Sequence, residues 1–175
     1  MRQIVKVMRE SLKNILQLFV LMVFLFVVRQ TKCAEQYEAV DGDSLEKGYI
    51  RIRLQDIDAP ELFQYCFDKN EQKYYCGKKA HEFLQRLIVG NIDCESYGKD
   101  RYGRQLMECF DKDGRSINQQ MVLNGWALSY SDKYSEDEII AKKMKKGIWQ
   151  GRFMRPELFR ALQKKKENSN KIKKR

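Results

Sequence analysis

Acidic and arginine side chains are concentrated in one short stretch of this sequence. The turn-like segment Asp41-Gly42-Asp43-Ser44 is followed by the run from Arg53 to Glu61, and a further arginine, Arg104, comes later in the chain. Carboxylates are ligands for hard divalent cations, and a guanidinium group binds phosphate oxygens through a planar fork. These residue types therefore indicate chemistry on a phosphate group held beside a divalent cation.

The strand that carries Arg53 is predicted from a strict alternation of residue types. Ile50, Ile52 and Leu54 are predicted to face a core, which leaves Arg53 on the solvent side. Asp58 lies an odd number of residues further on, so a flat strand would send it to the opposite face. If both residues serve one site, the strand must bulge or end between them.

The residues around Pro60 could supply cation ligands and a base. A proline restricts the residue before it to extended geometry, which fixes the direction of the Ala59 carbonyl beside the Asp58 carboxylate. Glu61 follows, and its longer side chain could reach past a cation to a water molecule. Asp56 could hydrogen-bond to the cation's ligands without touching the cation, or it could be a charged residue at the end of the strand. The second interpretation is favoured.

Short strands and amphipathic helices are predicted around these residues. Strands are expected over residues 36–40, 44–47, 49–55, 91–95 and 105–110, and helices over 77–88, 117–124 and from 135 to about 146. Ser116 is a predicted N-cap, and Ser135 with Glu138 forms a predicted capping box. His81 is expected on a solvated helix face. The fold class is predicted to be α+β and β-rich: a five-stranded OB-fold Greek-key barrel with three helices.

Four cysteines follow the first 33 residues. Cys94 and Cys109 are equidistant from a hairpin turn and could face each other, and Cys66 and Cys76 would then close a polar loop. Free thiols or a zinc site are the alternatives, and zinc is disfavoured because the sequence has no CxxC pair. Two disulfides would imply an oxidising compartment.

The ends of the chain carry most of its positive charge. The chain has 34 Lys/Arg and 24 Asp/Glu residues. Residues 1–33 contain six basic residues and one acidic residue, and residues 163–175 contain seven basic residues and one acidic residue. The 21 basic and 22 acidic residues that remain lie between these two segments. The net charge of +10 therefore does not by itself identify a nucleic-acid partner.

Three segments are predicted along the chain. Residues 1–33 are expected to be a cleaved signal peptide or, as the alternative, an N-terminal membrane anchor through the apolar run 15–28. Residues 34–153 form the main domain. Residues 154–175 are a basic tail, predicted to be disordered, with weak binding of anionic lipid or nucleic acid as a second option.

Several motifs, taken in order, resemble the staphylococcal nuclease (thermonuclease) family. They are Asp41-Gly42-Asp43-Ser44, the Arg53 to Glu61 run, residues 100–104 (Asp-Arg-Tyr-Gly-Arg), Gly125-Trp126-Ala127 and residues 146–149 (Lys-Gly-Ile-Trp). The resemblance covers roughly residues 36–153. The cysteines look like those of exported bacterial relatives, which implies a periplasmic or extracellular location, with membrane anchoring as an option.

The resemblance implies a calcium-dependent nuclease that hydrolyses phosphodiester bonds in DNA and RNA. Carried over, the Ca²⁺ ligands fall on Asp43, Asp58 and the Ala59 carbonyl, where the family prototype has threonine. The catalytic residues fall on Arg53, Glu61 and Arg104, the glutamate being the general base. No protein partner is implied, and a monomer is expected.

Two questions stay open at this stage. Tyr102, Tyr130 and Tyr134 could stack on bases, although a packing or rim position is the favoured explanation for each. A domain of this type could also be a non-catalytic nucleic-acid-binding or membrane-tethered adaptor.

Overall fold

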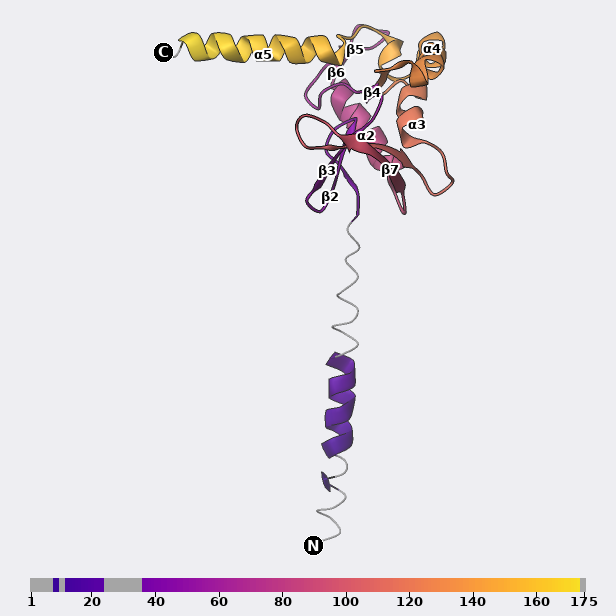
Figure 1. Cartoon of the computed structure of the whole chain (residues 1–175), viewed down its shortest axis with the longest axis vertical. Helices are drawn as coiled ribbons and strands as arrows, with labels where there is room; N and C mark the ends of the chain where they lie inside the picture. The colour runs from indigo at the N-terminus through magenta and orange to yellow at the C-terminus, as the bar shows by residue number, and fades with distance from the viewer. Residues whose placement is uncertain (1–7, 10–11, 24–35, 174–175) are drawn as a thin grey trace. The chain divides into compact units, whose positions relative to one another are not determined.

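The computed structural model describes residues 8–9, 12–23 and 36–173, and a five-stranded sheet lies within residues 36–173 (Figure 1). The chain divides into two units, Met1–Glu35 and Gln36–Arg175. Residues 12–23 of the first unit are helical. In the described residues no helix combines the length and apolar character needed to span a bilayer. The predicted cleavage region after residue 28 lies outside the described residues.

The second unit has a mixed α+β architecture. The central sheet has the order β1-β2-β3-β8-β7, with β3 and β8 parallel and the other neighbours antiparallel. Its strands are β1 (Glu38–Ala39), β2 (Ser44–Lys47), β3 (Ile50–Leu54), β7 (Asp93–Lys99) and β8 (Gln105–Phe110). Two small sheets pair β4 (Ile57–Asp58) with β9 (Leu128–Ser129) and β5 (Cys66–Phe67) with β6 (Lys73–Tyr74). Five strands in one sheet agree with the prediction, but the described residues form no closed barrel.

Four α-helices follow the early strands within residues 36–173. They are α2 (Cys76–Leu87), α3 (Ile117–Leu123), α4 (Ser135–Lys143) and α5 (Pro156–Lys173), with short 3-10 turns η1 (Asp132–Tyr134) and η2 (Gly147–Gln150). Three of these helices were predicted, whereas α5 occupies the segment for which a disordered tail was expected. Figure 1 shows α5 as one continuous helix leading away from the sheet.

The core lies between the sheet and the helices. Alternation on β3 buries Ile52 and Leu54 as predicted, but Ile50 at the strand's start remains 47% exposed. Ile52 and Leu54 pack with Leu84 of α2 and Met121 of α3 in one apolar cluster. Burial of such side chains stabilises the fold by about 1.5–3 kcal/mol each.

Both predicted disulfides form. Cys94 and Cys109 face each other directly across the β7–β8 ladder, with Cα atoms 4.1 Å apart. Cys66 and Cys76 link β5 to the first residue of α2, with Cα atoms 5.6 Å apart. The second bridge belongs to a separate small cluster with Leu128 and Ile148.

Of the two helix N-caps predicted from the sequence, one is confirmed and one is wrong. Ser116 caps α3, its hydroxyl accepting from the Gln119 N–H at 3.2 Å. The capping box predicted at Ser135 is wrong, because η1 runs directly into α4 and the Ser135 hydroxyl instead donates to the Asp132 carbonyl. Glu138, its predicted partner, accepts from the Ser129 N–H at 2.7 Å.

A buried carboxylate, Glu108, joins β8 to the two following segments. It accepts hydrogen bonds from the Ser116 hydroxyl at 2.9 Å and the Tyr134 hydroxyl at 2.7 Å, and it pairs with Lys133. Burial raises the pKa of Glu108, but these three hydrogen bonds outweigh it, so its pKa lies below the ordinary value. Burial and the bond to Glu108 raise the pKa of Tyr134 to about 12.

This network predicts a pH-dependent stability difference. Because the folded-state pKa of Glu108 is depressed, its contribution is present above the ordinary value of 4.5 and is lost as pH falls through the folded value. Glu108→Gln should lower the free energy of unfolding by roughly 1–3 kcal/mol at pH 7 and by much less in acid. Urea denaturation at both pH values measures this. Glu46→Gln, at an exposed strand position, is the control and should leave the free energy of unfolding unchanged at both pH values. A loss of the same size at both pH values for Glu108→Gln would contradict the assignment.

Candidate active site

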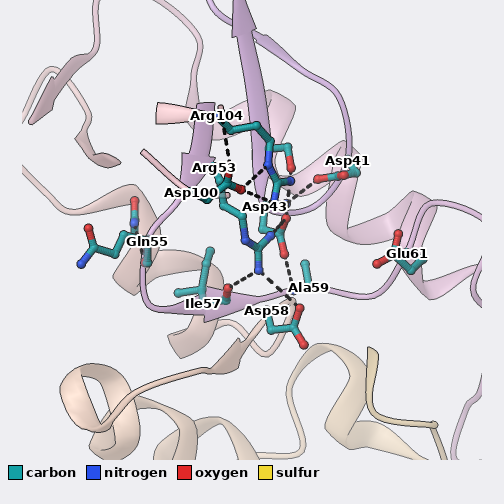
Figure 2. A network of polar contacts seen from close by, with 12 residues as sticks. Asp41, Asp43, Arg53, Gln55, Ile57, Asp58, Ala59, Glu61, Asp100 and Arg104 are labelled. Carbon is teal, nitrogen blue, oxygen red and sulfur yellow. Dashed lines mark hydrogen bonds and ion pairs between the residues drawn. The ribbon is translucent and has the colours of Figure 1, made fainter. Parts of the chain in front are cut away.

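The centre of the candidate site is an ion pair between the buried Asp43 and the partly buried Arg53. Asp43 directly precedes β2, and the β2–β3 register places Arg53 opposite the neighbouring Ser44. The Arg53 guanidinium pairs with Asp43 Oδ1, and its Nη2 donates to the Ile57 carbonyl at 3.0 Å and lies 3.5 Å from Asp58 Oδ1 (Figure 2). The guanidinium was predicted on a solvent face, but its side chain is only 19% exposed because these acids cover it.

The strand ends between Arg53 and Asp58, as predicted. β3 stops at Leu54, Asp56 adopts a left-handed conformation with φ of 64°, and β4 begins at Ile57. This break reverses the face to which the next residues point, so Asp58 comes to the same side as Arg53. Asp56 makes no ion pair within residues 36–173, and its carbonyl accepts from the Tyr130 N–H at 2.8 Å, in keeping with a strand-end residue.

The Asp41-Gly42-Asp43 turn is pressed against the residue after Asp58. Asp43 Oδ2 accepts from the Ala59 N–H at 2.8 Å, and Asp41 Oδ1 accepts from the Asp43 N–H at 2.9 Å. A Cβ at Gly42 would lie 2.6 Å from the Ala59 Cβ and 2.8 Å from the Ala80 Cβ of α2. Glycine is therefore required between the two acids, because only it allows this close approach.

Glu61 is held by its backbone against the start of α2. Its carbonyl accepts from the Gln64 N–H at 2.7 Å, and its N–H donates to the Gln64 side chain at 3.3 Å. The buried Gln64 side chain donates to the Met154 carbonyl at 2.6 Å, which ties this loop to the segment leading into α5. The Cys66–Cys76 bridge closes the same loop.

An arginine from α5 completes the group of charges, and nothing in the sequence pattern had pointed to it. Arg160 Nη1 lies 2.9 Å from both Asp58 Oδ1 and Glu61 Oε1, and its Nη2 donates to Asp58 Oδ2 at 3.1 Å. Burial lowers the pKa of Arg160, but the bonds to Asp58 and Glu61 outweigh this and raise it. A residue about a hundred positions away thus contacts a predicted cation ligand and the predicted base.

Arg104 lies at another edge of the group, where Asp100 holds it (Figure 2). The parallel pairing of β3 with β8 places Arg53 beside Leu106, two residues after Arg104. Asp100 Oδ2 accepts from Arg104 Nε at 2.8 Å and lies 2.8 Å from its Nη2. Burial raises the pKa of Asp100, but the bonds from Arg104 outweigh this and lower it. Arg104 does not contact Asp43 or Asp58 in the described structure.

The three tyrosines differ in exposure. Tyr102 is 62% exposed and Tyr130 is 74% exposed, so both rings are accessible. Tyr134 is buried and bonded to Glu108, so it cannot stack on a base and serves packing instead. His81 Nε2 donates to the Ala39 carbonyl at 3.0 Å, so the ring links α2 to β1 rather than facing solvent alone.

The charges of the site favour a divalent cation. Within residues 36–173, Asp41, Asp43, Asp58 and Glu61 lie with the guanidinium groups of Arg53 and Arg160, while Asp100 offsets Arg104, so two negative charges remain. Burial and the charge of Asp43 raise the pKa of Asp41. The donor types therefore fit Ca²⁺.

The present arrangement pairs these acids with arginines. Among the residues that the structure describes, no group of three or more His, Cys, Asp or Glu side chains is placed to hold a metal ion. Both Asp58 oxygens are bonded to Arg160, so a cation could bind Asp58 only if the Arg160 side chain turned away or shared this carboxylate.

Comparison with known proteins places most of these residues in one family of domains. The family model described as "Staphylococcal nuclease homologue" matches residues 51–151. That range contains Arg53, Asp58, Glu61 and Arg104, whereas Asp43 precedes it and Arg160 follows it.

Individual relatives share about a third of their aligned residues with this chain. A succinoglycan biosynthesis protein, ExoI, of Rhizobium meliloti is 33% identical over 120 residues, which is 65% of this chain and 63% of that protein. An uncharacterized endonuclease of Escherichia coli O157:H7 is 33% identical over 121 residues, covering 63% of this chain and 72% of that protein. Endonuclease YhcR of Bacillus subtilis is 31% identical over 130 residues, covering 63% of this chain but only 11% of its own length.

The contact between Glu61 and α2 leads to a prediction about Gly77. A Cβ at this position would lie 1.8 Å from the Glu61 carbonyl oxygen and 2.5 Å from its carbon. Gly77→Ala must therefore displace the Glu61 backbone and should lower the free energy of unfolding by about 1–3 kcal/mol. Thermal denaturation measures this against Lys78→Ala, an exposed change in the same helical turn. Equal melting temperatures for both variants would show that the Glu61 loop is not held against α2.

Proposed function

Because the chain belongs to the staphylococcal nuclease homologue family, we propose that it is a calcium-dependent nuclease that hydrolyses phosphodiester bonds of DNA and RNA. The observation that carries the proposal is the convergence of Asp43, Arg53 and Asp58 on one buried cluster, with Glu61 joined to it through Arg160. Endonuclease-named relatives support the same reaction class.

Cation binding is assigned to the carboxylates next to Arg53. Asp43, Asp58 and the Ala59 carbonyl would hold Ca²⁺, which supplies charge neutralisation and Lewis acidity at a phosphate oxygen. The Asp43–Ala59 bond fixes these two segments relative to each other. Their relative position is therefore set by the fold before any ligand arrives.

Glu61 acts as the general base in this proposal. Its side chain is 37% exposed, and Oε1 is bonded to Arg160 while Oε2 has no such bond in the described structure. Oε2 is thus the oxygen assigned to the proton of the attacking water. A base in this role typically contributes about 10²- to 10⁴-fold in rate.

The two arginines of the family pattern stabilise the charge that develops on the phosphate. Arg53 borders Asp43 and Asp58, and Arg104 is held by Asp100 through Nε and Nη2, which leaves Nη1 for a phosphate oxygen. Lysine at either position would keep the charge but lose the fork.

The two disulfides support an oxidising location. We therefore propose export to the periplasm or the extracellular space. Cleavage of residues 1–33, the alternative of an anchor, and a monomeric state remain predictions from the sequence.

Cleavage of plasmid and single-stranded DNA in Ca²⁺ or in EGTA tests the proposal. Wild-type protein should cut in Ca²⁺ only, and Glu61→Gln should lower the rate by about 10²-fold or more while retaining nucleic-acid binding. Glu157→Gln, an exposed acid on α5, is the matched control and should cut normally. Tight binding by a wild-type protein that never cuts would instead support the adaptor function.

The contacts of Arg160 predict that it competes with the cation. Arg160→Ala removes one positive charge and frees both Asp58 oxygens, so Ca²⁺ should bind roughly tenfold more tightly. Isothermal titration calorimetry measures this without any assay of activity. Lys165→Ala removes the same charge from α5 without touching Asp58 and should change the affinity little. Weaker Ca²⁺ binding in Arg160→Ala would mean that Arg160 instead holds Asp58 in its cation-binding position.

A further inference from the structure

A groove opens directly beside Glu61, between the loop that carries this residue and α5. Asp41, Glu61 and Phe63 line the groove from the loop side, and Phe159, Arg160, Lys164 and Glu167 line it from α5. Its volume is about 610 Å³, within the range of roughly 300–1,000 Å³ that is typical of small-ligand sites. None of the family's motifs supplies its α5 wall, because α5 lies beyond the residues that the family model matches.

We propose that this groove binds the nucleotide next to the cleaved phosphodiester bond, as an extension of the substrate site. The inference rests on the proposed function, because a polymeric substrate must continue on both sides of the bond that is cut. Arg104 and Glu61 lie at different edges of the site (Figure 2). A strand that passes the cluster and leaves on the Glu61 side enters this groove.

Lys164 is the cation that meets the phosphate. It follows Arg160 by four residues and therefore lies one turn further along the same face of α5. Arg160 is bonded to Asp58 and Glu61, whereas Lys164 has no ion pair or hydrogen bond within the described residues. An unpaired ammonium group beside a site for phosphate chemistry matches a negatively charged backbone.

Phe63 is the ring on which the base stacks. Its side chain is 79% exposed although it is fully apolar, and it follows Glu61 by two residues. Every base presents a flat face to such a ring, so stacking gives affinity without sequence preference. Phe159 on the opposite wall closes the groove from α5. A ring and a cation together match a nucleotide better than an uncharged apolar ligand.

Binding of a fluorescein-labelled oligothymidylate, followed by anisotropy at several salt concentrations, tests the proposal. The measurements use Glu61→Gln protein so that the ligand stays intact, with Ca²⁺ present. Lys164→Ala should weaken binding and reduce the slope of log affinity against log salt by about 0.7, the value for one phosphate contact on a single strand. Lys165→Ala removes the same charge but does not line the groove, and its slope should stay at that of the parent protein.

A second pair of variants tests the ring. Phe63→Ala should weaken binding by about fivefold or more without changing the salt slope. Tyr49→Ala, a fully exposed aromatic residue in the β2–β3 turn, should leave the affinity unchanged. Equal effects of Lys164→Ala and Lys165→Ala, or unchanged affinity in Phe63→Ala, would overturn the proposal.

The outcome is separable from that of the proposed function. Wild-type cleavage in Ca²⁺ with no effect of the groove variants on binding would refute the groove alone. Loss of binding in those variants, with a wild-type protein that does not cut, would uphold the groove as a nucleotide-binding site and refute the nuclease.

Discussion

The pairing of Asp43 with Arg53 and Ala59 is the constraint on which the rest of the site depends. A carboxylate that is almost completely buried is tolerated only when its oxygens are bonded. Asp43 meets that requirement with the Arg53 guanidinium on one oxygen and the Ala59 N–H on the other. One side chain therefore fixes the β2 entry, the end of β3 and the segment that follows Asp58. The positions of the candidate residues on those segments therefore depend on the two bonds that Asp43 makes.

Much of this arrangement could be predicted from local patterns. Arg53 and Asp58 are an odd number of residues apart, so they could share one site only if the strand broke between them. Asp56, with its positive φ, provides this break. Cys94 and Cys109 pair because they lie at similar distances on either side of one hairpin turn. Such predictions succeed because strand alternation and hairpin register are set by neighbouring residues alone.

Other features depend on contacts that no local pattern encodes. Ser135 and Glu138 have the spacing of a capping box, but η1 runs into α4 without a break. The Glu138 carboxylate instead accepts a hydrogen bond from the Ser129 N–H. For Tyr134 the sequence left both stacking and packing open, and its hydrogen bond to the buried Glu108 shows that it packs. Arg160 lies in the basic segment 154–175, where no motif distinguished it from the other basic residues. The partners of these side chains come from distant segments, so only the assembled fold reveals them.

The position of α5 rests on polar contacts more than on apolar packing. The helix meets the body of the protein through Arg160 and through the preceding Met154 carbonyl, which Gln64 binds. Leu158 and Leu162 remain about half exposed, at 55% and 46%. A helix held by Asp58 and Glu61 is sensitive to whatever else binds those acids. The proposed cation ligand Asp58, the proposed base Glu61 and the groove wall are therefore physically linked through one guanidinium group.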